Sequence, residues 1–524
     1  MKARGDRPSA GSRGGTSGGG RGGTSGGSRG GGAARGGSGG GRKPARDHAR
    51  NAAYDVLRAV DERDSYANLL LPRLLRERGI GGRDAALATE LAYGTLRGLG
   101  TYDAIIEMCS DRAPDPEVRD ALRLGAHQLL KMRVPPHAAV GTTVDLVRLR
   151  VGPGAAKFVN AVARKIASRS LEEWVPIVAP DAADDPAGHL AVAHSHPRWI
   201  VSAFRDALGG AAHETAELLD ADNARPLVTL VARPGRSSVG ELRESGAEPG
   251  RYSPYAAYLS EGDPGRIEAV HDTRAAVQDE ASQLVALALT RVPLDGRDEL
   301  WLDLCAGPGG KTGLLDAIAR HGDVAGLEAA GDLRTGPEGD GAVPGGGVVM
   351  PGGGVAVPYA GGARVLAGDV QYHRARLVWE TTRDAAVITA DGTEPAWRPG
   401  VFDRVMLDAP CTGLGALRRR PEARWRRDPA SISELGRLQR RLLGTALDSV
   451  RPGGVVAYVT CSPHLAETRV VVGDVIGGRA DVEPLDARDY LPGVDGLGDG
   501  PYAQFWPHRH GTDAMFLALL RKAA

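Results

Sequence analysis

The stretch LWLDLCAGPGGKT, residues 300–312, decides the fold of this 524-residue chain. Its apolar first half reads as a buried strand, and its glycines form a tight turn that opens a helix. Apolar runs of the same kind follow at residues 365–367, 385–390, 405–407 and 455–459, with helical patterns between them. Apolar strands that alternate with helices indicate an α/β domain with a doubly wound, mostly parallel sheet.

Two further segments precede this domain, which we expect at residues 266–524. Residues 46–172 carry a helical pattern, with Val56, Leu57 and Val60 on one face, and predict an all-α domain. Residues 173–265 mix helical and strand patterns and predict a small α+β connector. The predicted fold class is therefore a Rossmann-like α/β sheet preceded by a helical domain and a connector.

Two segments are low in sequence complexity. Residues 1–45 hold nine Lys or Arg and a single acidic residue among Gly, Ser and Thr, so we expect a disordered basic tail. Such a tail could add non-specific affinity for RNA through phosphate contacts, or could be an extension without a dedicated role. Residues 321–362 contain 14 glycines, and we expect a largely disordered insertion there.

The cysteine content points to a reducing compartment. Cys109, Cys305, Cys411 and Cys461 are too few for a disulfide scaffold, and none lies at a metal-ligand spacing. We therefore expect reduced thiols, a cytoplasmic protein and no metal. The formal net charge is zero, and no apolar run approaches the roughly 18 residues of a membrane span, which predicts no membrane partner. The oligomeric state stays open, with a monomer as the expectation.

The glycine-rich turn is the first candidate binding element. Backbone N–H groups can approach a ligand closely at such a turn, and the helix that follows favours negative charge at its start. The spacing matches a Walker A motif poorly, because no Gly lies five residues before Gly310, and a P-loop NTPase is disfavoured. The candidate ligand-binding residues here are Cys305, Ala306, Gly307, Pro308, Gly309, Gly310 and Lys311.

Carboxylates follow the later strands of the predicted sheet. Asp369 follows the second strand and suits ribose hydroxyls, Asp391 follows the third and suits an adenine amino group, and Asp408 ends the fourth. Any one of them could merely cap a helix, but together with the glycine turn they predict a single ligand crevice. Residues 323–328 compete for the second strand, and we prefer Asp369 because a helical pattern follows it.

Two motifs place cysteines at adjacent strand ends. DAPCTG, residues 408–413, follows the fourth strand, and TCS, residues 460–462, follows the fifth. Cytosine C5 is a poor nucleophile, and a thiolate that adds to C6 would push electron density onto C5 and could leave again afterwards. A free thiol is only slightly ionised at neutral pH, so such a site must stabilise the anion. A lone cysteine at a strand end is often structural, whereas this flanked pair favours catalysis.

The run RRRPEARWRR, residues 418–427, lies close to these motifs. Six arginines and a tryptophan combine phosphate pairing with a stacking surface and favour contact with RNA over a merely solvated charge run.

At these residues the chain resembles the RNA cytosine-5 methyltransferases of the Sun/Fmu type, in the branch that acts on 16S ribosomal RNA. The likeness extends from Ala49 to the end of the chain, and Thr412 is a mild departure where Ser is more usual. LAYGTLR at 91–97 and PPHAA at 135–139 resemble the NusB-type RNA-binding domain of that family, and VQDEAS at 277–282 resembles the segment before its catalytic sheet.

The resemblance implies roles for the candidate residues. Cys461 would be the nucleophile that attacks C6, and Cys411 would assist release of the product. Residues 305–311, Asp369, Asp391 and Asp408 would bind S-adenosylmethionine (SAM), and Asp408 could also contact the cytosine near N3. Ribosomal RNA of the small subunit would be the substrate and partner.

Three rival interpretations are weaker. A non-catalytic RNA-binding or assembly factor on the same fold would explain the helical domain and the tail, but every residue that the chemistry needs is present. DNA cytosine methyltransferases would make Cys411 the nucleophile, and the TCS motif and the NusB-like domain argue against that. Amino-group methylation lacks its Asn-Pro-Pro-Tyr or Asp-Pro-Pro-Tyr motif.

Overall fold

A computed structural model describes residues 47–63, 65–323, 348–349, 355–356, 361–382 and 384–524. The predicted tail at 1–45 and most of the predicted insertion at 321–362 lie outside these residues. Two short strands of the insertion are described, β6 (Val348–Val349) and β7 (Val355–Ala356), and they pair antiparallel. Across the described ranges, none of the helices is both long and apolar enough to span a membrane.

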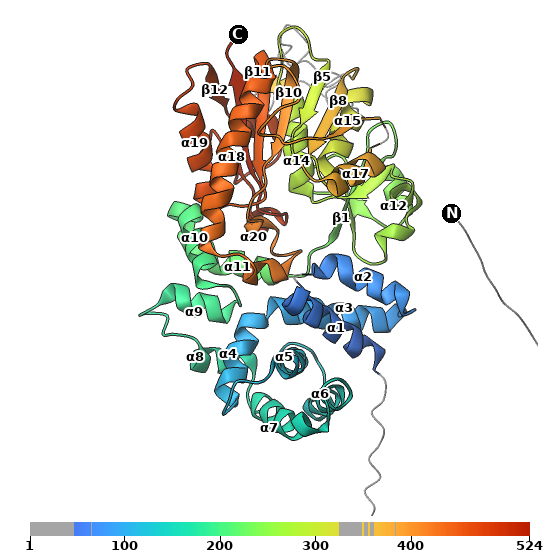
Figure 1. Cartoon of the computed structure of the whole chain (residues 1–524), viewed down its shortest axis with the longest axis vertical. Helices are drawn as coiled ribbons and strands as arrows, with labels where there is room; N and C mark the ends of the chain where they lie inside the picture. The colour runs from blue at the N-terminus through green and yellow to red at the C-terminus, as the bar shows by residue number, and fades with distance from the viewer. Residues whose placement is uncertain (1–46, 64, 324–347, 350–354, 357–360, 383) are drawn as a thin grey trace, which may run out of the picture. The chain divides into compact units, whose positions relative to one another are not determined.

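The N-terminal part is helical, as predicted (Figure 1). Its apolar faces share one core, in which Leu57, Leu91 and Leu122 are at most 2% exposed. Pro116 and Pro136 stand in the first turns of their helices, where a missing N–H costs no hydrogen bond. The helices are α1 (His48–Arg63), α2 (Ala67–Glu77), α3 (Gly82–Arg97), α4 (Leu99–Cys109), α5 (Pro116–Leu130), α6 (Pro136–Arg150) and α7 (Ala156–Ile166).

A connector of helices and a small sheet follows. Its helices are α8 (Leu171–Val178), α9 (Pro186–Ala193), α10 (Arg198–Leu208), α11 (Thr215–Asn223), α12 (Val239–Glu244) and α13 (Glu268–His271). The sheet has the order β2 (Glu248–Pro249), β3 (Ala256–Leu259), β1 (Val228–Ala232) and β4 (Ala275–Val277), and β1 pairs antiparallel with both neighbours. Strand β1 lies within the segment 173–265, where strand patterns were predicted, while β4 joins this sheet from beyond residue 265.

The C-terminal part contains the predicted doubly wound sheet. Its order is β12 (Val482–Leu485), β14 (Phe516–Lys522), β11 (Val450–Thr460), β10 (Phe402–Asp408), β5 (Leu300–Asp303), β8 (Arg364–Asp369) and β9 (Ala386–Thr389). The five strands expected from the apolar runs are β5, β8, β9, β10 and β11, and they are parallel to one another. Strand β14 is antiparallel to β11 and β12. The short strand β13 (Ala503–Gln504) pairs with the first two residues of β14, Phe516 and Leu517.

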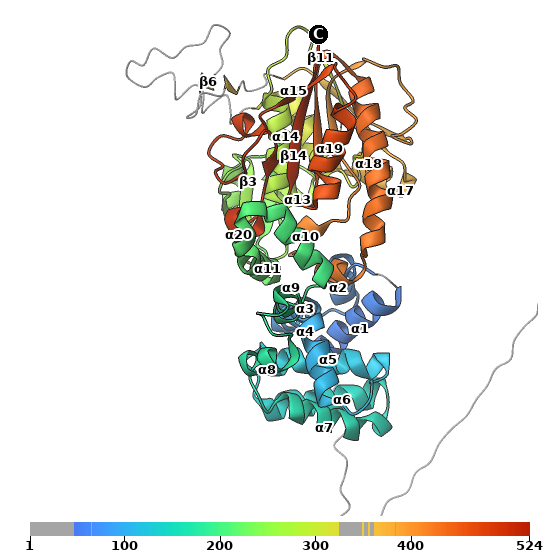
Figure 2. The same ribbon diagram turned by 90° about the vertical axis from the view of Figure 1, so that its left-hand side faces the viewer.

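Helices cover both faces of this sheet (Figure 2). On one face, α14 (Glu280–Arg291) and α15 (Gly310–His321) pack through Leu287 and Leu314 onto a core with Trp301. On the other, α18 (Pro429–Ser449) and α19 (Arg469–Ile476) pack onto a second core with Leu302 and Val405. The remaining helices are α17 (Tyr372–Thr381), α20 (Pro507–His510) and 3-10 turns at Pro153–Ala155, Gly209–Glu214, Pro264–Arg266, Leu414–Ala416, Pro421–Trp425, Leu465–Glu467 and Ala487–Tyr490.

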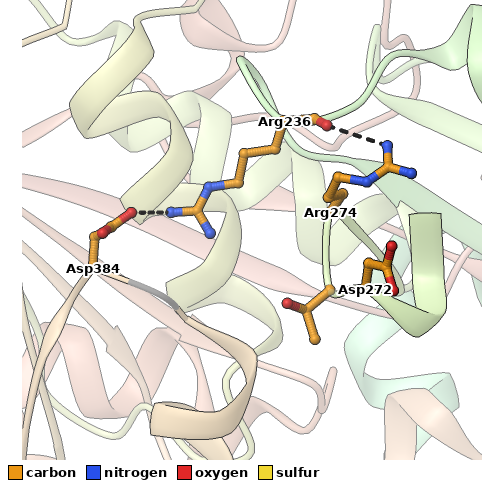
Figure 3. Close-up of a pocket in the computed structure, with 5 residues that line it drawn as sticks. Arg236, Asp272, Arg274 and Asp384 are labelled. Atoms are coloured by element: carbon orange, nitrogen blue, oxygen red, sulfur yellow. Dashed lines mark hydrogen bonds and ion pairs between the residues drawn. The ribbon is translucent and has the colours of Figure 1, made fainter. Parts of the chain in front are cut away.

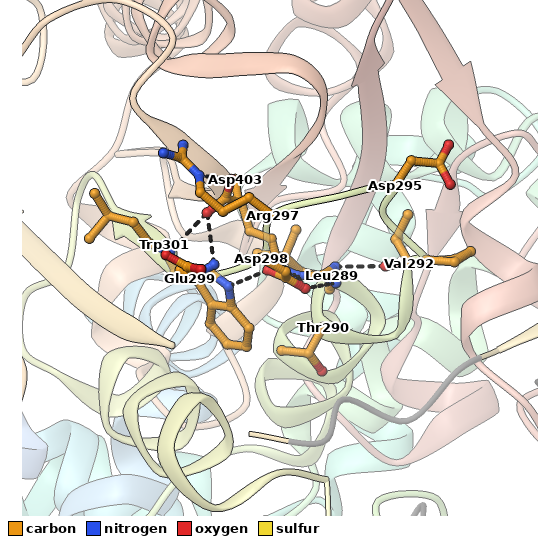
Figure 4. A network of polar contacts seen from close by, with 12 residues as sticks. Leu289, Thr290, Val292, Asp295, Arg297, Asp298, Glu299, Trp301 and Asp403 are labelled. Atoms are coloured by element: carbon orange, nitrogen blue, oxygen red, sulfur yellow. Dashed lines mark hydrogen bonds and ion pairs between the residues drawn. The ribbon is translucent and has the colours of Figure 1, made fainter. Parts of the chain in front are cut away.

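A buried carboxylate fixes the amino ends of the central strands (Figure 4). Asp403 in β10 accepts hydrogen bonds from the backbone N–H groups of Glu299 and Leu300, at 2.8 and 2.9 Å, and ion pairs with Arg297 and Arg451. Burial alone would raise the pKa of Asp403, but these donors lower it below its ordinary value. The network ties β5, β10 and β11 together at the end opposite Asp408, so that their carboxyl ends emerge in a fixed relation.

Candidate active site

The predicted site residues gather at the carboxyl ends of the central strands. The chain runs outward from β5 through β8 to β9 on one side, and from β10 to β11 on the other. The strand order therefore reverses between β5 and β10. In open α/β sheets, ligands bind in the crevice outside such a reversal. Asp303, Asp369, Asp408 and Thr460 end the strands β5, β8, β10 and β11 at this place.

The turn after β5 requires glycine at two positions. Gly309 has φ 106°, in the left-handed region, and a Cβ there would lie 2.2 Å from Oγ1 of Thr381. A Cβ on Gly307 would lie 2.4 Å from Oδ2 of Asp369. Instead, the N–H of Gly307 donates to that carboxylate at 3.1 Å, and Arg374 donates to the carbonyl of Gly307. The predicted turn and the predicted ribose carboxylate are thus direct neighbours.

Lys311, the second residue of α15, reaches across to β10. Its Nζ lies 2.7 Å from Oδ2 of Asp408, and its side chain is 10% exposed. Burial disfavours the ammonium, but the Asp408 carboxylate and its hydrogen bond outweigh burial, and the pKa of Lys311 is raised. The pair therefore links the glycine turn to the strand that carries the first cysteine motif.

The two cysteines of the predicted motifs face each other. The Sγ atoms of Cys411 and Cys461 lie 3.4 Å apart, and both cysteines are partly buried. The thiol of Cys411 hydrogen bonds to the sulfur of Cys461 and lowers the pKa of Cys461, and the nearby Lys311 ammonium acts in the same direction. The same contact and burial raise the pKa of Cys411. The pair therefore favours a thiolate on Cys461 and a protonated thiol on Cys411.

A buried glutamate that the sequence reasoning missed holds the two cysteine loops together. Glu467 is 0% exposed, and its Oε1 accepts the N–H of Thr412 at 2.8 Å. Its Oε2 accepts from the hydroxyl of Ser462 at 2.7 Å and from the hydroxyl of Thr412. Thr412 follows Cys411 and Ser462 follows Cys461, so one carboxylate binds the neighbours of both cysteines. No motif surrounds Glu467, and only its position six residues after Cys461 could have drawn attention to it.

Burial raises the pKa values of two further groups beside the turn, Asp303 and Cys305. Asp303 is 1% exposed, and burial raises its pKa to about 7, although the Thr312 hydroxyl donates to Oδ2 at 2.7 Å. Its Oδ1 has no hydrogen-bond partner within the described part of the chain. Burial and the neighbouring carboxylates also raise the pKa of Cys305. Burial therefore disfavours the anionic form of both groups.

The remaining carboxylates lie in different surroundings. Strand β8, which ends at Asp369, pairs directly with β5, as we preferred for the second strand. Asp323, from the competing segment, is instead buried against the hydroxyl of Tyr255 and the guanidinium of Arg291. Asp391 follows β9 but is exposed, and its carboxylate accepts the N–H and the hydroxyl of Thr393, each at 2.8 Å.

The arginine run at 418–427 is only partly a surface. Arg424 is 0% exposed and donates to the carbonyls of Arg97, Ser195 and Asp222. Arg419 pairs with the buried Asp513. The expectation that the whole run faces RNA is wrong for Arg424, because its guanidinium is buried and bonds to carbonyls inside the protein. Arg420, Trp425 and Arg427 are exposed.

A separate hollow of about 400 Å³ is lined by charged residues of the connector and of the segment before β9 (Figure 3). Arg236 pairs with Asp384 at 2.6 Å and Arg274 pairs with Glu241, so its positive charges are already balanced. We assign it no ligand. The described residues also contain no cluster of three or more His, Cys, Asp or Glu side chains that could hold a metal ion.

Comparisons with known proteins agree with this arrangement. A family model described as 16S rRNA methyltransferase RsmB/F matches residues 352–521, and the NusB family model matches residues 47–168. A protein of Mycobacterium tuberculosis assigned as a methyltransferase, Rv1407, is 52% identical over 91% of this chain and 97% of its own length. Ribosomal RNA small subunit methyltransferase B of Xylella fastidiosa is 30% identical over 84% of this chain and 92% of its own.

A solved structure confirms the fold over the same extent. The crystal structure of PH0851 superposes with a TM-score of 0.69 at 21% identity, and the match covers 91% of this chain and 99% of that one. The resemblance inferred from the motifs is therefore confirmed at the level of the family. The RsmB/F model covers the strands that precede both cysteines, and the small subunit methyltransferase B of Xylella fastidiosa is 30% identical over most of both chains. The chain therefore belongs to the RsmB/F family of 16S rRNA methyltransferases.

Proposed function

We propose that this protein transfers a methyl group from SAM to C5 of a cytosine in 16S ribosomal RNA, through a covalent bond between Cys461 and C6 of the base. The observation that carries the proposal is the 3.4 Å separation of the two sulfurs at adjacent strand ends. The Lys311–Asp408 pair connects these strand ends to the glycine turn.

The electrostatics support Cys461 as the nucleophile. Its pKa is lowered while that of Cys411 is raised, so the thiolate forms first on Cys461. That sulfur forms a bond to C6, and electron density moves to C5, which becomes the nucleophile for the methyl group. Methyl transfer leaves S-adenosylhomocysteine. A water molecule then takes the C5 proton, the electron pair of the C5–H bond forms the C5=C6 double bond, and the C6–S bond breaks with its electron pair returning to Cys461. The protonated Cys411 would assist this release, whereas the DNA methyltransferase alternative would need the opposite order of pKa values.

The residues around the glycine turn fit a SAM molecule. SAM supplies an electrophilic methyl group on a sulfonium centre. In the turn from Cys305 to Lys311, side chains would not fit at Gly307 or Gly309. The turn opens α15, and the start of a helix favours a negatively charged group. Asp369 would bind the ribose hydroxyls and Asp391 the adenine amino group. Asp408 would orient Lys311 and the cytosine ring.

The NusB-type domain supports RNA as the substrate. Its family model covers residues 47–168, and the relative from Xylella fastidiosa is named for the small ribosomal subunit. The exposed Arg420, Trp425 and Arg427 follow the Cys411 loop and combine phosphate pairing with a stacking surface. With ribosomal RNA as the substrate, the reaction would take place in the cytoplasm.

Three matched cysteine variants test the proposal. We expect Cys461→Ala to abolish transfer of labelled methyl groups from SAM to 16S ribosomal RNA. We expect Cys411→Ala to leave methylated RNA attached to the protein on a denaturing gel. Cys109→Ala is the control, because that thiol is buried in the helical domain and should leave transfer unchanged.

Bisulfite sequencing of the RNA would identify the methylated cytosine. Wild-type turnover by the Cys461→Ala protein would exclude the covalent mechanism. A wild-type protein that binds RNA but transfers no methyl group would point to the non-catalytic RNA-binding alternative.

A further inference from the structure

Gln278 is a buried amide whose side chain has no partner. It directly follows β4, and 7% of the residue is exposed. Neither its Nε2 nor its Oε1 makes a hydrogen bond to any residue that the structure describes. Its backbone is fully used, because its N–H donates to the carbonyl of Thr229 at 2.9 Å and its carbonyl accepts from Gln283 at 3.2 Å. The fold therefore fixes the position of Gln278 without using its side chain.

The other buried glutamines behave differently. Gln283 is 0% exposed, and its Nε2 donates to two carbonyls while its Oε1 accepts the hydroxyl of Ser253. Gln128 uses both amide atoms, and Gln439 and Gln504 use their Nε2. An unpaired buried amide costs about 1–3 kcal/mol, a cost that an apolar side chain in the same place would avoid. Gln278 is thus the one member of this set, within the described residues, that contributes nothing to the fold through its amide.

The unpaired amide lies against the first turn of α15. Its Cδ is 3.9 Å and its Cγ is 4.0 Å from the place where a Cβ would stand on Gly310, the first residue of that helix. The first N–H groups of a helix of this length have no partners within the helix and favour negative charge. Asp369 lies at a different part of the same turn, against Gly307. The amide and the ribose carboxylate therefore contact separate residues of the glycine turn.

We infer that the carboxamide of Gln278 binds the amino-acid end of the methyl donor. The amide has a free N–H donor and a free oxygen acceptor, so it matches a ligand group that carries both an acceptor and a donor. If the acceptor of that group is a carboxylate, its negative charge would suit the start of α15. The zwitterionic end of SAM has this chemistry, with Nε2 donating to its carboxylate and Oε1 accepting from its ammonium. This inference rests on the proposed function, since it concerns the same donor.

Two ligands that differ only at this end test the inference. S-adenosylhomocysteine keeps the amino-acid group, and 5′-methylthioadenosine lacks it. For Gln278→Leu in the full-length protein, we expect calorimetry to show about 10- to 100-fold weaker binding of S-adenosylhomocysteine, which corresponds to about 1.4–2.8 kcal/mol of lost hydrogen bonding. Binding of 5′-methylthioadenosine should change less than twofold.

Stability measurements separate this role from a structural one. The melting temperature of ligand-free Gln278→Leu should equal or exceed that of the wild type, because the substitution removes an unpaired buried group. Gln128→Ala in the helical domain is the matched control: both atoms of its amide are used within the fold, so it should lower the melting temperature and leave the ratio of the two affinities unchanged. Gln278→Glu provides a second variant, which should weaken S-adenosylhomocysteine further through repulsion between carboxylates.

The possible failures are distinct. Equal weakening of both ligands, or no weakening of either, would overturn the role of Gln278 while leaving SAM as the donor. A wild-type protein that binds neither ligand would overturn the proposed function itself, and the inference with it.

Discussion

Removing the Glu467 carboxylate should loosen both cysteine loops at once. Its two oxygens accept hydrogen bonds from the N–H and hydroxyl of Thr412, the hydroxyl of Ser462 and the amide of Gln439. In Glu467→Ala, Gln439 keeps its bond to the carbonyl of Pro410 at 2.9 Å, and the two hydroxyls, 3.2 Å apart, can bond to each other. The N–H of Thr412 and one hydroxyl proton are then left without an acceptor.

The expected destabilisation follows from these orphaned donors. Two unsatisfied buried donors cost about 1–3 kcal/mol each, and the cavity adds to this, so we expect Glu467→Ala to lose roughly 3–6 kcal/mol. Glu467→Gln should lose only about 1 kcal/mol, because its carbonyl can accept the Thr412 N–H while its NH₂ group donates to the hydroxyl oxygens. The substitution of a carboxylate by an amide thus separates hydrogen-bond geometry from charge.

Urea unfolding followed by circular dichroism measures these differences, and Glu434→Ala on the exposed face of α18 is the control. The rate at which iodoacetamide alkylates Cys461 in the folded protein reports the local effect. We expect this rate to change strongly in Glu467→Ala and weakly in Glu467→Gln. Equal losses of stability for Ala and Gln, or a loss below 1 kcal/mol for Ala, would refute the assignment of Glu467 as the residue that holds the two loops.

Three other outcomes follow from the same structure. Cys411→Ala should move the onset of Cys461 alkylation to higher pH, because the hydrogen bond that lowers the Cys461 pKa is lost; an unchanged pH–rate profile would contradict this. Asp303 has a folded pKa of about 7 against an ordinary 3.8, so it binds a proton more tightly when folded, and its contribution to stability is lost as pH rises from about 4 to 7. Asp303→Asn should therefore gain stability over the ligand-free wild type at pH 8 more than at pH 4, which melting curves at both pH values would check. Arg424→Met should lower the free energy of unfolding by about 3–5 kcal/mol by leaving buried acceptors unpaired, whereas the exposed Arg427→Met should change it by less than about 0.5 kcal/mol.

Local sequence patterns were enough to predict the central strands. The apolar runs correspond to β5, β8, β9, β10 and β11, since buried parallel strands need apolar side chains on both faces. The start of α18 follows local rules of the same kind, since Asp428 accepts the N–H of Ser431 at 2.9 Å and Pro429 stands in the first turn. The antiparallel strand β14 was not predicted, because its place beside β11 depends on pairing between Thr460 and Phe516, far apart in the chain.

The same contrast between local patterns and distant contacts applies to the candidate site. Residues that carry chemistry in short motifs, such as Cys411 and Lys311, were predicted from the sequence, because their neighbours in the chain are also their neighbours in the site. Glu467 and Gln278 were missed, since each is defined by partners, or by a lack of partners, that only the folded chain reveals. Arg424 shows the opposite error: a charged residue in a charged run reads as surface, but its guanidinium satisfies carbonyls of three other segments.

The spacing of the two sulfurs is ultimately set by strand register. Strands β10 and β11 run parallel with Asp408 beside Val459, so their loops leave the sheet together, and Cys411 and Cys461 follow within three residues. A slip of one residue would move one loop by about 3.3 Å and turn its side chains to the opposite face. That displacement is as large as the 3.4 Å that separates the sulfurs, so the thiol of Cys411 could no longer reach Cys461. The Asp403 network at the amino ends and Glu467 at the carboxyl ends fix this register from both sides, so the spacing of the two sulfurs depends on both carboxylates.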